Sequence, residues 1–114
     1  MSDIPFRREP TAAPGEAPLE YELPHDGRVR LTVRAGERRT GGYGITVTRI
    51  TRTGSRLTIT CETRAPAAAA IVTQVLTSPA QTVSVDAALV RGIRDAALLD
   101  QSGAELARVS RISA

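Results

Sequence analysis

The chain is poor in the residues that most often carry catalysis or bind metals. Its 114 residues include one cysteine, Cys61, and one histidine, His25. One cysteine excludes an intramolecular disulfide and a cysteine-based metal cluster within the chain. One histidine removes most zinc sites, catalytic triads and proton shuttles. We therefore expect a protein that is not an enzyme and that binds neither metal nor cofactor.

The two residues themselves fit this expectation. Cys61 falls in the middle of a predicted strand, on its inward face, where a thiol behaves as a small hydrophobe and its pKa rises. His25 stands beside Asp26 and Gly27, in a pattern typical of a turn before a strand. Cys61 is therefore predicted to be a core residue, and His25 an ordinary exposed loop histidine.

Aromatic residues are also scarce. There is no tryptophan, and Phe6, Tyr21 and Tyr43 are the three aromatics. The core must therefore consist of valine, isoleucine, leucine and alanine, and β-branched side chains favour sheets. At this length the chain forms one domain with a modest core.

Long apolar runs are absent as well. No run of about 18 apolar residues is present, so no membrane span is expected. The N-terminal residues lack the apolar stretch of a secretory signal. As it stands the sequence predicts a cytoplasmic protein, although a chain whose signal had been removed would read the same way.

Lysine is missing, and all fifteen basic residues are arginine. Their distribution is uneven. Residues 1–27 hold two arginines against six acids, residues 28–64 hold nine against two acids, and residues 65–114 hold four of each. The small net charge of +3 thus conceals a strongly basic middle segment.

The first 24 residues predict a flexible, acidic, proline-rich arm that precedes a single β domain at residues 25–114. This arm contains five prolines, which resist both helices and sheet ladders. It has the opposite charge to the basic middle and is able to fold back on it. Leu19, Tyr21 and Leu23 alternate, which predicts a short edge strand at the end of the arm.

Alternation also defines the strands of the middle segment. In residues 28–34 and 56–62, apolar side chains alternate with arginine, threonine or glutamate. A segment that begins at Ile45 follows the same pattern until Ile50, where the alternation breaks. A bulge near residues 48–49 would return Ile50 to the apolar face. With a turn at residues 51–55, the second and third strands form a hairpin.

The C-terminal part predicts further strands. Residues 71–76 and 81–85 are rich in β-branched residues, and residues 96–100 and 104–109 form a hairpin around a type I turn that begins at Asp100. Residues 86–94 are either helix or strand. The predicted fold is all-β: a small antiparallel β-sandwich or open barrel of six to eight short strands.

The loop at residues 36–44 is the candidate site for a protein partner. Glycines on both sides of Tyr43 allow bends that a Cβ would forbid, and loops on a rigid scaffold often carry recognition. Tyr43 is either a plug at the end of the core or an anchor for the partner. The candidate partner-binding residues are Arg38, Arg39, Thr40, Gly41, Gly42, Tyr43 and Gly44.

A nucleic-acid-binding face is the alternative use of the arginines. Arginines that neutralise phosphates release counterions and give affinity without reading bases. However, single-strand binders stack bases on aromatic side chains, and only Tyr43 is available. A solvated sheet face is the more economical interpretation, and we do not expect a nucleic-acid partner. The face in question comprises Arg28, Arg30, Arg34, Thr46, Arg56, Thr58 and Thr60.

One block of the chain resembles the C-terminal domain of the protease complex subunit PrcB family. The resemblance spans about residues 29–86 and is carried by the segment from Thr40 to Val47, Pro66, the segment at residues 72–79 and Val83 to Val85. It implies a small β domain without catalytic residues, in a family named for a subunit that associates with and stabilises a subtilisin-like protease. The sequence departs from the family at Ala80, where an aromatic is common.

The same loop also resembles that of the chagasin-type inhibitors of cysteine proteases, which use a Thr-Thr-Gly-Tyr loop. Here the loop reads Thr40, Gly41, Gly42, Tyr43. The other contact loops of those inhibitors have no counterpart. We therefore expect a protein-binding, accessory subunit of a protease complex, with protease inhibition as the alternative. An exposed strand edge would also allow a homodimer.

Overall fold

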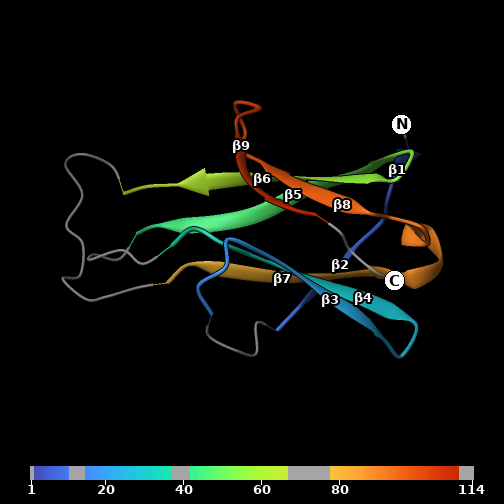
Figure 1. Ribbon diagram of the computed structural model, residues 1–114. Helices are drawn as coiled ribbons and strands as arrows, with labels where there is room; N and C mark the ends of the chain where they lie inside the picture. The colour runs from blue at the N-terminus through green and yellow to red at the C-terminus, as the bar shows by residue number, and fades with distance from the viewer. Residues whose placement is uncertain (1, 11–14, 37–41, 67–77, 111–114) are drawn as a thin grey trace.

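The computed structural model describes residues 2–10, 15–36, 42–66 and 78–110. These residues form two stacked sheets, of five strands in the order β1-β5-β6-β8-β9 and of four strands in the order β2-β7-β4-β3 (Figure 1). The all-β class and the sandwich are thus confirmed. The elements are β1 (Ser2–Asp3), β2 (Arg7–Glu9), β3 (Leu19–His25), β4 (Arg28–Arg34), β5 (Gly44–Thr53), β6 (Arg56–Arg64), β7 (Ala80–Asp86), the 3-10 helix η1 (Ala87–Val90), β8 (Asp95–Leu99) and β9 (Glu105–Val109).

The predicted hairpin of β5 and β6 is confirmed, including its bulge. The two strands pair from Gly44↔Arg64 to Thr53↔Arg56, and their register shifts between Val47 and Arg49. The extra residue reverses the alternation, so Ile50 is buried, with 1% of its surface exposed. The need to bury Ile50 therefore explains the irregular strand.

A two-residue turn joins β3 to β4. Asp26 and Gly27 both have positive φ, at 53° and 75°. A right-twisted hairpin requires this conformation at both central residues, and an aspartate followed by glycine adopts it readily. The turn predicted around His25 is thus confirmed, as is the edge strand that precedes it.

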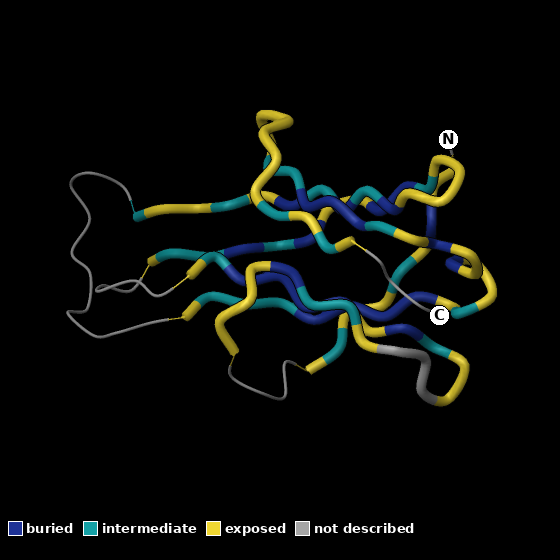
Figure 2. Tube along the Cα trace, in the orientation of Figure 1, coloured by how far each residue is buried: buried dark blue, intermediate teal, exposed yellow. Residues whose placement is uncertain are grey.

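The core lies between the two sheets and is aliphatic, as the scarcity of aromatics predicts. Figure 2 shows buried stretches along the strands of both sheets and exposed residues at the turns. Large side chains that are fully buried come from β4, β5, β6, β7 and β8, and on β3 Leu19 is 4% exposed. Close packing of this kind explains how the fold is held without an intramolecular disulfide. The largest are Leu31, Ile50, Leu57, Ile59, Ile93 and Leu98.

The N-terminal residues differ from the expected loose arm, since part of them crosses from one sheet to the other. Ser2 and Asp3 pair with β5, and Arg7 to Glu9 pair with β7. Between them, Ile4 is buried in the core and its N–H donates to the carbonyl of Ile50 at 2.8 Å. Pro5 follows and has no N–H to continue the ladder. We call residues 2–9 the N-terminal crossover.

Side chains close the seam where β5 of one sheet meets β7 of the other. The N–H of Val47 donates to Oε1 of Gln81 at 2.7 Å, and the carbonyl of Val47 accepts from Nη2 of Arg8 at 3.1 Å. Both backbone groups of Val47 thus have partners from the opposite sheet. This capping satisfies polar groups on the outer edge of β5, at a position that β1 does not reach.

The C-terminal hairpin is confirmed, and the ambiguous segment before it is neither of the two alternatives alone. Residues 87–90 form a single turn of 3-10 helix, and the Asp86 carboxylate caps it by accepting from the N–H of Ala88. In the turn between β8 and β9, the N–H of Gly103 donates to the Asp100 carbonyl at 3.0 Å. This is the bond of the predicted type I turn.

One strand pair departs from the antiparallel pattern, because β6 and β8 are parallel. The connection between them therefore runs through β7 and η1 on the opposite sheet. The strand predicted at residues 71–76 lies outside the described residues. Among the helices of the described residues, none has the length and apolarity needed to cross a membrane.

Candidate functional site

The structure describes three of the seven residues predicted to bind a partner. Gly42, Tyr43 and Gly44 lead into β5, whereas residues 38–41 lie outside the described part of the chain. The site is therefore built from these three residues and from the strands and turns around them.

Gly42 is fixed by its backbone and by a close neighbour. Its φ is +88°, a conformation that L-residues with a Cβ rarely adopt. A Cβ added to Gly42 would stand 2.9 Å from Cβ of Pro66, which follows the end of β6. The entrance to β5 and the exit from β6 thus pack against each other through a glycine and a proline.

Gly44 also lies close to a residue of β6. It pairs with Arg64 across the hairpin, and a Cβ at Gly44 would lie 3.0 Å from Nη2 of that arginine. The short segment around Tyr43 therefore lies beside Pro66 and Arg64. The backbone that leads to Tyr43 is constrained by the positive φ of Gly42 and by the contact of Gly42 with Pro66.

Tyr43 is partly buried. It is neither a fully buried plug nor a fully exposed anchor, so part of its ring packs on the domain and part faces solvent. Tyrosine suits this position, because its ring is apolar and its hydroxyl is polar. A ring held in this way can add to an interface without first having to be ordered.

The strands beside Tyr43 extend beyond the rest of their sheet. The last rung between β6 and β8 is Thr60↔Leu99, yet β6 continues to Arg64. Beyond that rung, the side-chain amide of Gln101 takes the place of a strand: its Oε1 accepts from the N–H of Thr63 at 3.0 Å and its Nε2 donates to the Thr63 carbonyl at 2.9 Å. The β5–β6 ribbon therefore projects with one edge capped by a side chain (Figure 1).

A small cavity of about 290 Å³ lies near the start of the loop, lined by Gly15, Glu16, Arg34, Gly36, Ser78 and Pro79. Arg34 is mostly buried, with 8% of its side chain exposed, and its Nη1 donates to Glu20 Oε1 and to the Ala17 carbonyl, both at 3.0 Å. This arginine anchors the segment that precedes β3. We assign it a structural role.

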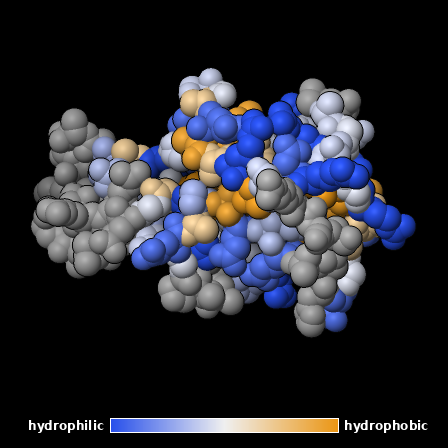
Figure 3. Space-filling view, in the orientation of Figure 1, coloured by the Kyte–Doolittle hydropathy of each residue, from blue (hydrophilic) through white to orange (hydrophobic). Residues whose placement is uncertain are grey.

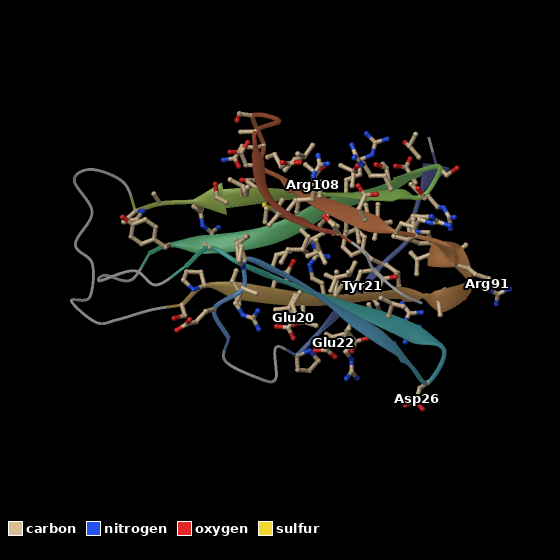
Figure 4. The ribbon with its side chains drawn as sticks, viewed as in Figure 1. Glu20, Tyr21, Glu22, Asp26, Arg91 and Arg108 are labelled. Atoms are coloured by element: carbon tan, nitrogen blue, oxygen red, sulfur yellow. The ribbon has the colours of Figure 1, made fainter. Side chains whose placement is uncertain are left out.

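The arginine and threonine face predicted from alternation is not a single surface. It consists of arginines on β4 and of threonines and an arginine on β5 and β6. These two groups point away from the shared core, but they belong to different sheets and lie on opposite sides of the sandwich. Figure 4 shows this for Glu20 and Glu22 on the outer side of the four-stranded sheet and for Arg108 on the other sheet. Arg28, Arg30 and Arg34 lie on β4, whereas Thr46, Arg56, Thr58 and Thr60 lie on β5 and β6.

Acids from neighbouring strands also engage these arginines. Arg56 pairs with Asp95 at 3.0 Å, and Arg34 pairs with Glu20 at 3.0 Å. On the face drawn in Figure 3, hydrophilic side chains surround a central band of apolar ones. A phosphate chain would have to displace these acids, and the predicted arginines that the structure describes are divided between two sheets.

Cys61 occupies the position predicted for it. It is fully buried, and the burial of its thiol raises its pKa, with the Asp100 charge acting in the same direction. A thiol in this environment is a poor nucleophile. Among the described residues, no group of three or more histidine, cysteine, aspartate or glutamate side chains could hold a metal ion.

Comparison with known proteins identifies one family. The family model described as PrcB C-terminal matches residues 31–86, from β4 to the end of β7. No curated protein and no solved structure gave a significant match. The matched segment contains Gly42, Tyr43, Gly44 and Pro66, and the N-terminal crossover, β8 and β9 lie outside it.

Proposed function

Because residues 31–86 belong to the PrcB C-terminal family, we propose that this chain is a non-enzymatic protein-binding domain that serves as an accessory, stabilising subunit of a protease complex. The observation that carries the proposal is the Gly42–Pro66 contact. It holds Tyr43, partly exposed, at the end of a projecting ribbon. The burial of Cys61 and the lack of a second histidine support a role without catalysis.

Stabilisation of the partner would follow from mass action. A domain that binds only the folded protease stabilises it by RT ln(1 + [L]/Kd), which is about 2.7 kcal/mol when the free domain is at 100 times Kd. No chemical step by the domain is needed. The partly exposed tyrosine, flanked by Arg64 on β6, would supply an amphipathic anchor of the kind enriched at the centre of interfaces.

The test is capture of a protease by the purified chain, followed by measurement of that protease's thermal inactivation with and without the chain. We expect capture at moderate salt and a longer half-life of the protease. Tyr43→Ala should weaken capture by about tenfold or more, as for an interface hot spot. Leu106→Ala, which truncates an exposed side chain on β9, is the matched control and should bind normally.

Two outcomes would count against the proposal. Capture of a protease that is equally strong with Tyr43→Ala would remove this corner from the interface. Inhibition of the captured protease, instead of protection, would favour the alternative of an inhibitor.

A further inference from the structure

A second surface lies at the opposite end of the sandwich, beside η1. A pocket of about 290 Å³ is lined there by Pro5, Phe6, Arg7, Arg28, Asp86 and Leu89. We call it the Phe6–Leu89 pocket. The ten residues of β5 run between Tyr43 and this end of the domain, a distance of about 30 Å. The two surfaces are therefore separate.

One side of the pocket is apolar. It is formed by Pro5 and Phe6 of the N-terminal crossover and by Leu89. Leu89 is 39% exposed, although exposure of a leucine side chain to water is energetically unfavourable. Leu89 is not on a loose segment, because its carbonyl accepts from Nη1 of Arg52 at 3.1 Å and the Asp86 cap fixes the start of the helix. An exposed leucine on a fixed turn is a preformed contact point.

The other side of the pocket is basic. Arg28 is held by Ser84, whose hydroxyl accepts from Nε and whose carbonyl accepts from Nη2, both at 2.9 Å. The Ser84 hydroxyl in turn donates to Glu9 at 2.7 Å. The guanidinium group of Arg28 therefore has a defined orientation and keeps Nη1 for another acceptor.

The charges lining the pocket are not balanced. Within the described residues, Arg7 has no acidic partner at ion-pair distance, and Arg8 beside it lies over the Phe6 ring, 5.6 Å from the centroid. Asp86 is the one acid in the lining, and its carboxylate accepts from the backbone of Ala88. Two arginines thus face the pocket against one acid that already has a partner.

From this complementarity we propose that the Phe6–Leu89 pocket binds an acidic segment of a partner protein, in which a carboxylate side chain lies next to an apolar side chain. The carboxylate would sit between Arg7 and Arg28, since guanidinium groups bind carboxylates through paired, charge-assisted hydrogen bonds. The apolar side chain would cover Leu89 and Phe6. A bare phosphate or a nucleic-acid backbone would meet the arginines but leave the apolar side uncovered.

This proposal does not depend on the proposed function, because the pocket lies outside the Tyr43 corner. The probe is a fluorescein-labelled peptide of six residues, blocked at both ends, that alternates glutamate and leucine. Its binding to the full chain is followed by anisotropy. Two further peptides, one with lysine in place of glutamate and one with serine in place of leucine, separate the charge and apolar contributions.

We expect saturable binding of the glutamate–leucine peptide and at least about tenfold weaker binding of each altered peptide. Arg7→Glu and Leu89→Ser should each weaken binding of the first peptide by a similar factor. Both residues are exposed, so these variants should fold, which circular dichroism would verify. Arg108→Glu makes the same change of charge at an exposed position on β9 of the other sheet and should bind within about twofold of the unchanged chain.

The proposal is overturned if the peptide does not bind, if serine replaces leucine without loss, or if Arg108→Glu weakens binding as much as Arg7→Glu does. Loss of binding in Tyr43→Ala would show that the peptide uses the other corner. Sedimentation that reveals a dimer, dissociated by Leu89→Ser, would instead assign the pocket to a second copy of the chain.

Discussion

The backbone N–H of Val47 donates a 2.7 Å hydrogen bond to the side-chain oxygen of Gln81, so that a strand of one sheet is capped by a side chain of the other. The same sandwich uses a second glutamine, Gln101, to cap Thr63. Each glutamine side-chain oxygen accepts a hydrogen bond from a backbone N–H, but the first bond is partly buried at the seam and the second is exposed.

This difference predicts unequal costs of removing the two amides. Gln81→Ala should lower the free energy of unfolding by about 1–3 kcal/mol, because it leaves a backbone N–H without a partner where water has limited access. Gln101→Ala should cost about 1 kcal/mol or less, because water can replace the amide. Urea unfolding measures both values. Equal costs would mean that water reaches the seam freely.

The Gly42–Pro66 contact predicts a similar contrast between two glycines. Gly103→Ala places a Cβ at φ +87° with nothing within 4 Å, and should cost about 1–2 kcal/mol from the backbone conformation alone. Gly42→Ala has the same conformation, at φ +88°, and also meets Pro66, so it should cost more. If chemical denaturation gives the same value for both, Pro66 moves aside without cost.

Tyr21 supplies a prediction of increased stability. It lies between the sheets (Figure 4), and its hydroxyl has no hydrogen-bond partner within the described residues. A buried polar group without a partner loses its hydration for no gain. Tyr21→Phe should therefore raise the free energy of unfolding by about 1 kcal/mol in thermal or urea unfolding. Tyr43→Phe is the comparison, because Tyr43 is also partly buried but is not without a partner.

The same residue gives an alkaline pH dependence. Burial raises the pKa of Tyr21 above its ordinary value of 10.0, and the charge of Arg52 opposes this shift. A raised pKa means that the folded state favours the protonated hydroxyl, so the associated stability is present below pH 10 and is lost as the pH rises through the folded pKa. Tyr21→Phe should remove the part of the stability loss at alkaline pH that comes from this hydroxyl. If the free energy of unfolding falls as steeply with alkaline pH in Tyr21→Phe as in the unchanged chain, the loss comes from other groups.

Asp100 gives the opposite, acidic dependence. The hydroxyl and N–H of Ser102 and the N–H of Ala104 donate to its carboxylate, which lowers its pKa below 3.8. The stability from this charge is present above the ordinary pKa and is lost as the pH falls through the lowered one. Asp100→Asn should therefore show a shallower loss of stability below about pH 4, measured by urea unfolding across the acid range. If the free energy of unfolding falls in the same way at acid pH in Asp100→Asn and in the unchanged chain, this turn is not a source of the loss.

Local patterns in the sequence predict the β5–β6 hairpin in detail. Ile50 breaks the alternation, and only a bulge restores it to the core, so the irregularity itself marks the bulge. The same reasoning recovers the turn at Asp100, because its residues determine the turn type. In both cases the physical cause lies within a few residues of its effect.

The parts that the sequence does not reveal depend on distant pairing. Strands of two or three residues, such as β1 and β2, are too short to show a period, and their partners lie far along the chain. The alternation of apolar and polar residues likewise predicts that Arg30 and Thr58 point outward, but it does not predict that they belong to different sheets. At the candidate site, the glycines around Tyr43 indicate an unusual backbone, whereas the contact with Pro66 appears only once the hairpin is paired.

The N-terminal crossover has a consequence for the order of folding. Glu9 reaches Ser84 across 75 residues of sequence, and the seam at Val47 needs Arg8 as well as Gln81. A chain that is synthesised from its N-terminal end must therefore hold β1 unpaired until β5 is available and β2 unpaired until β7 is available. Pairings across such separations slow folding. We expect β1 and β2 to join last and to detach first, which would open the Phe6–Leu89 pocket before the core unfolds.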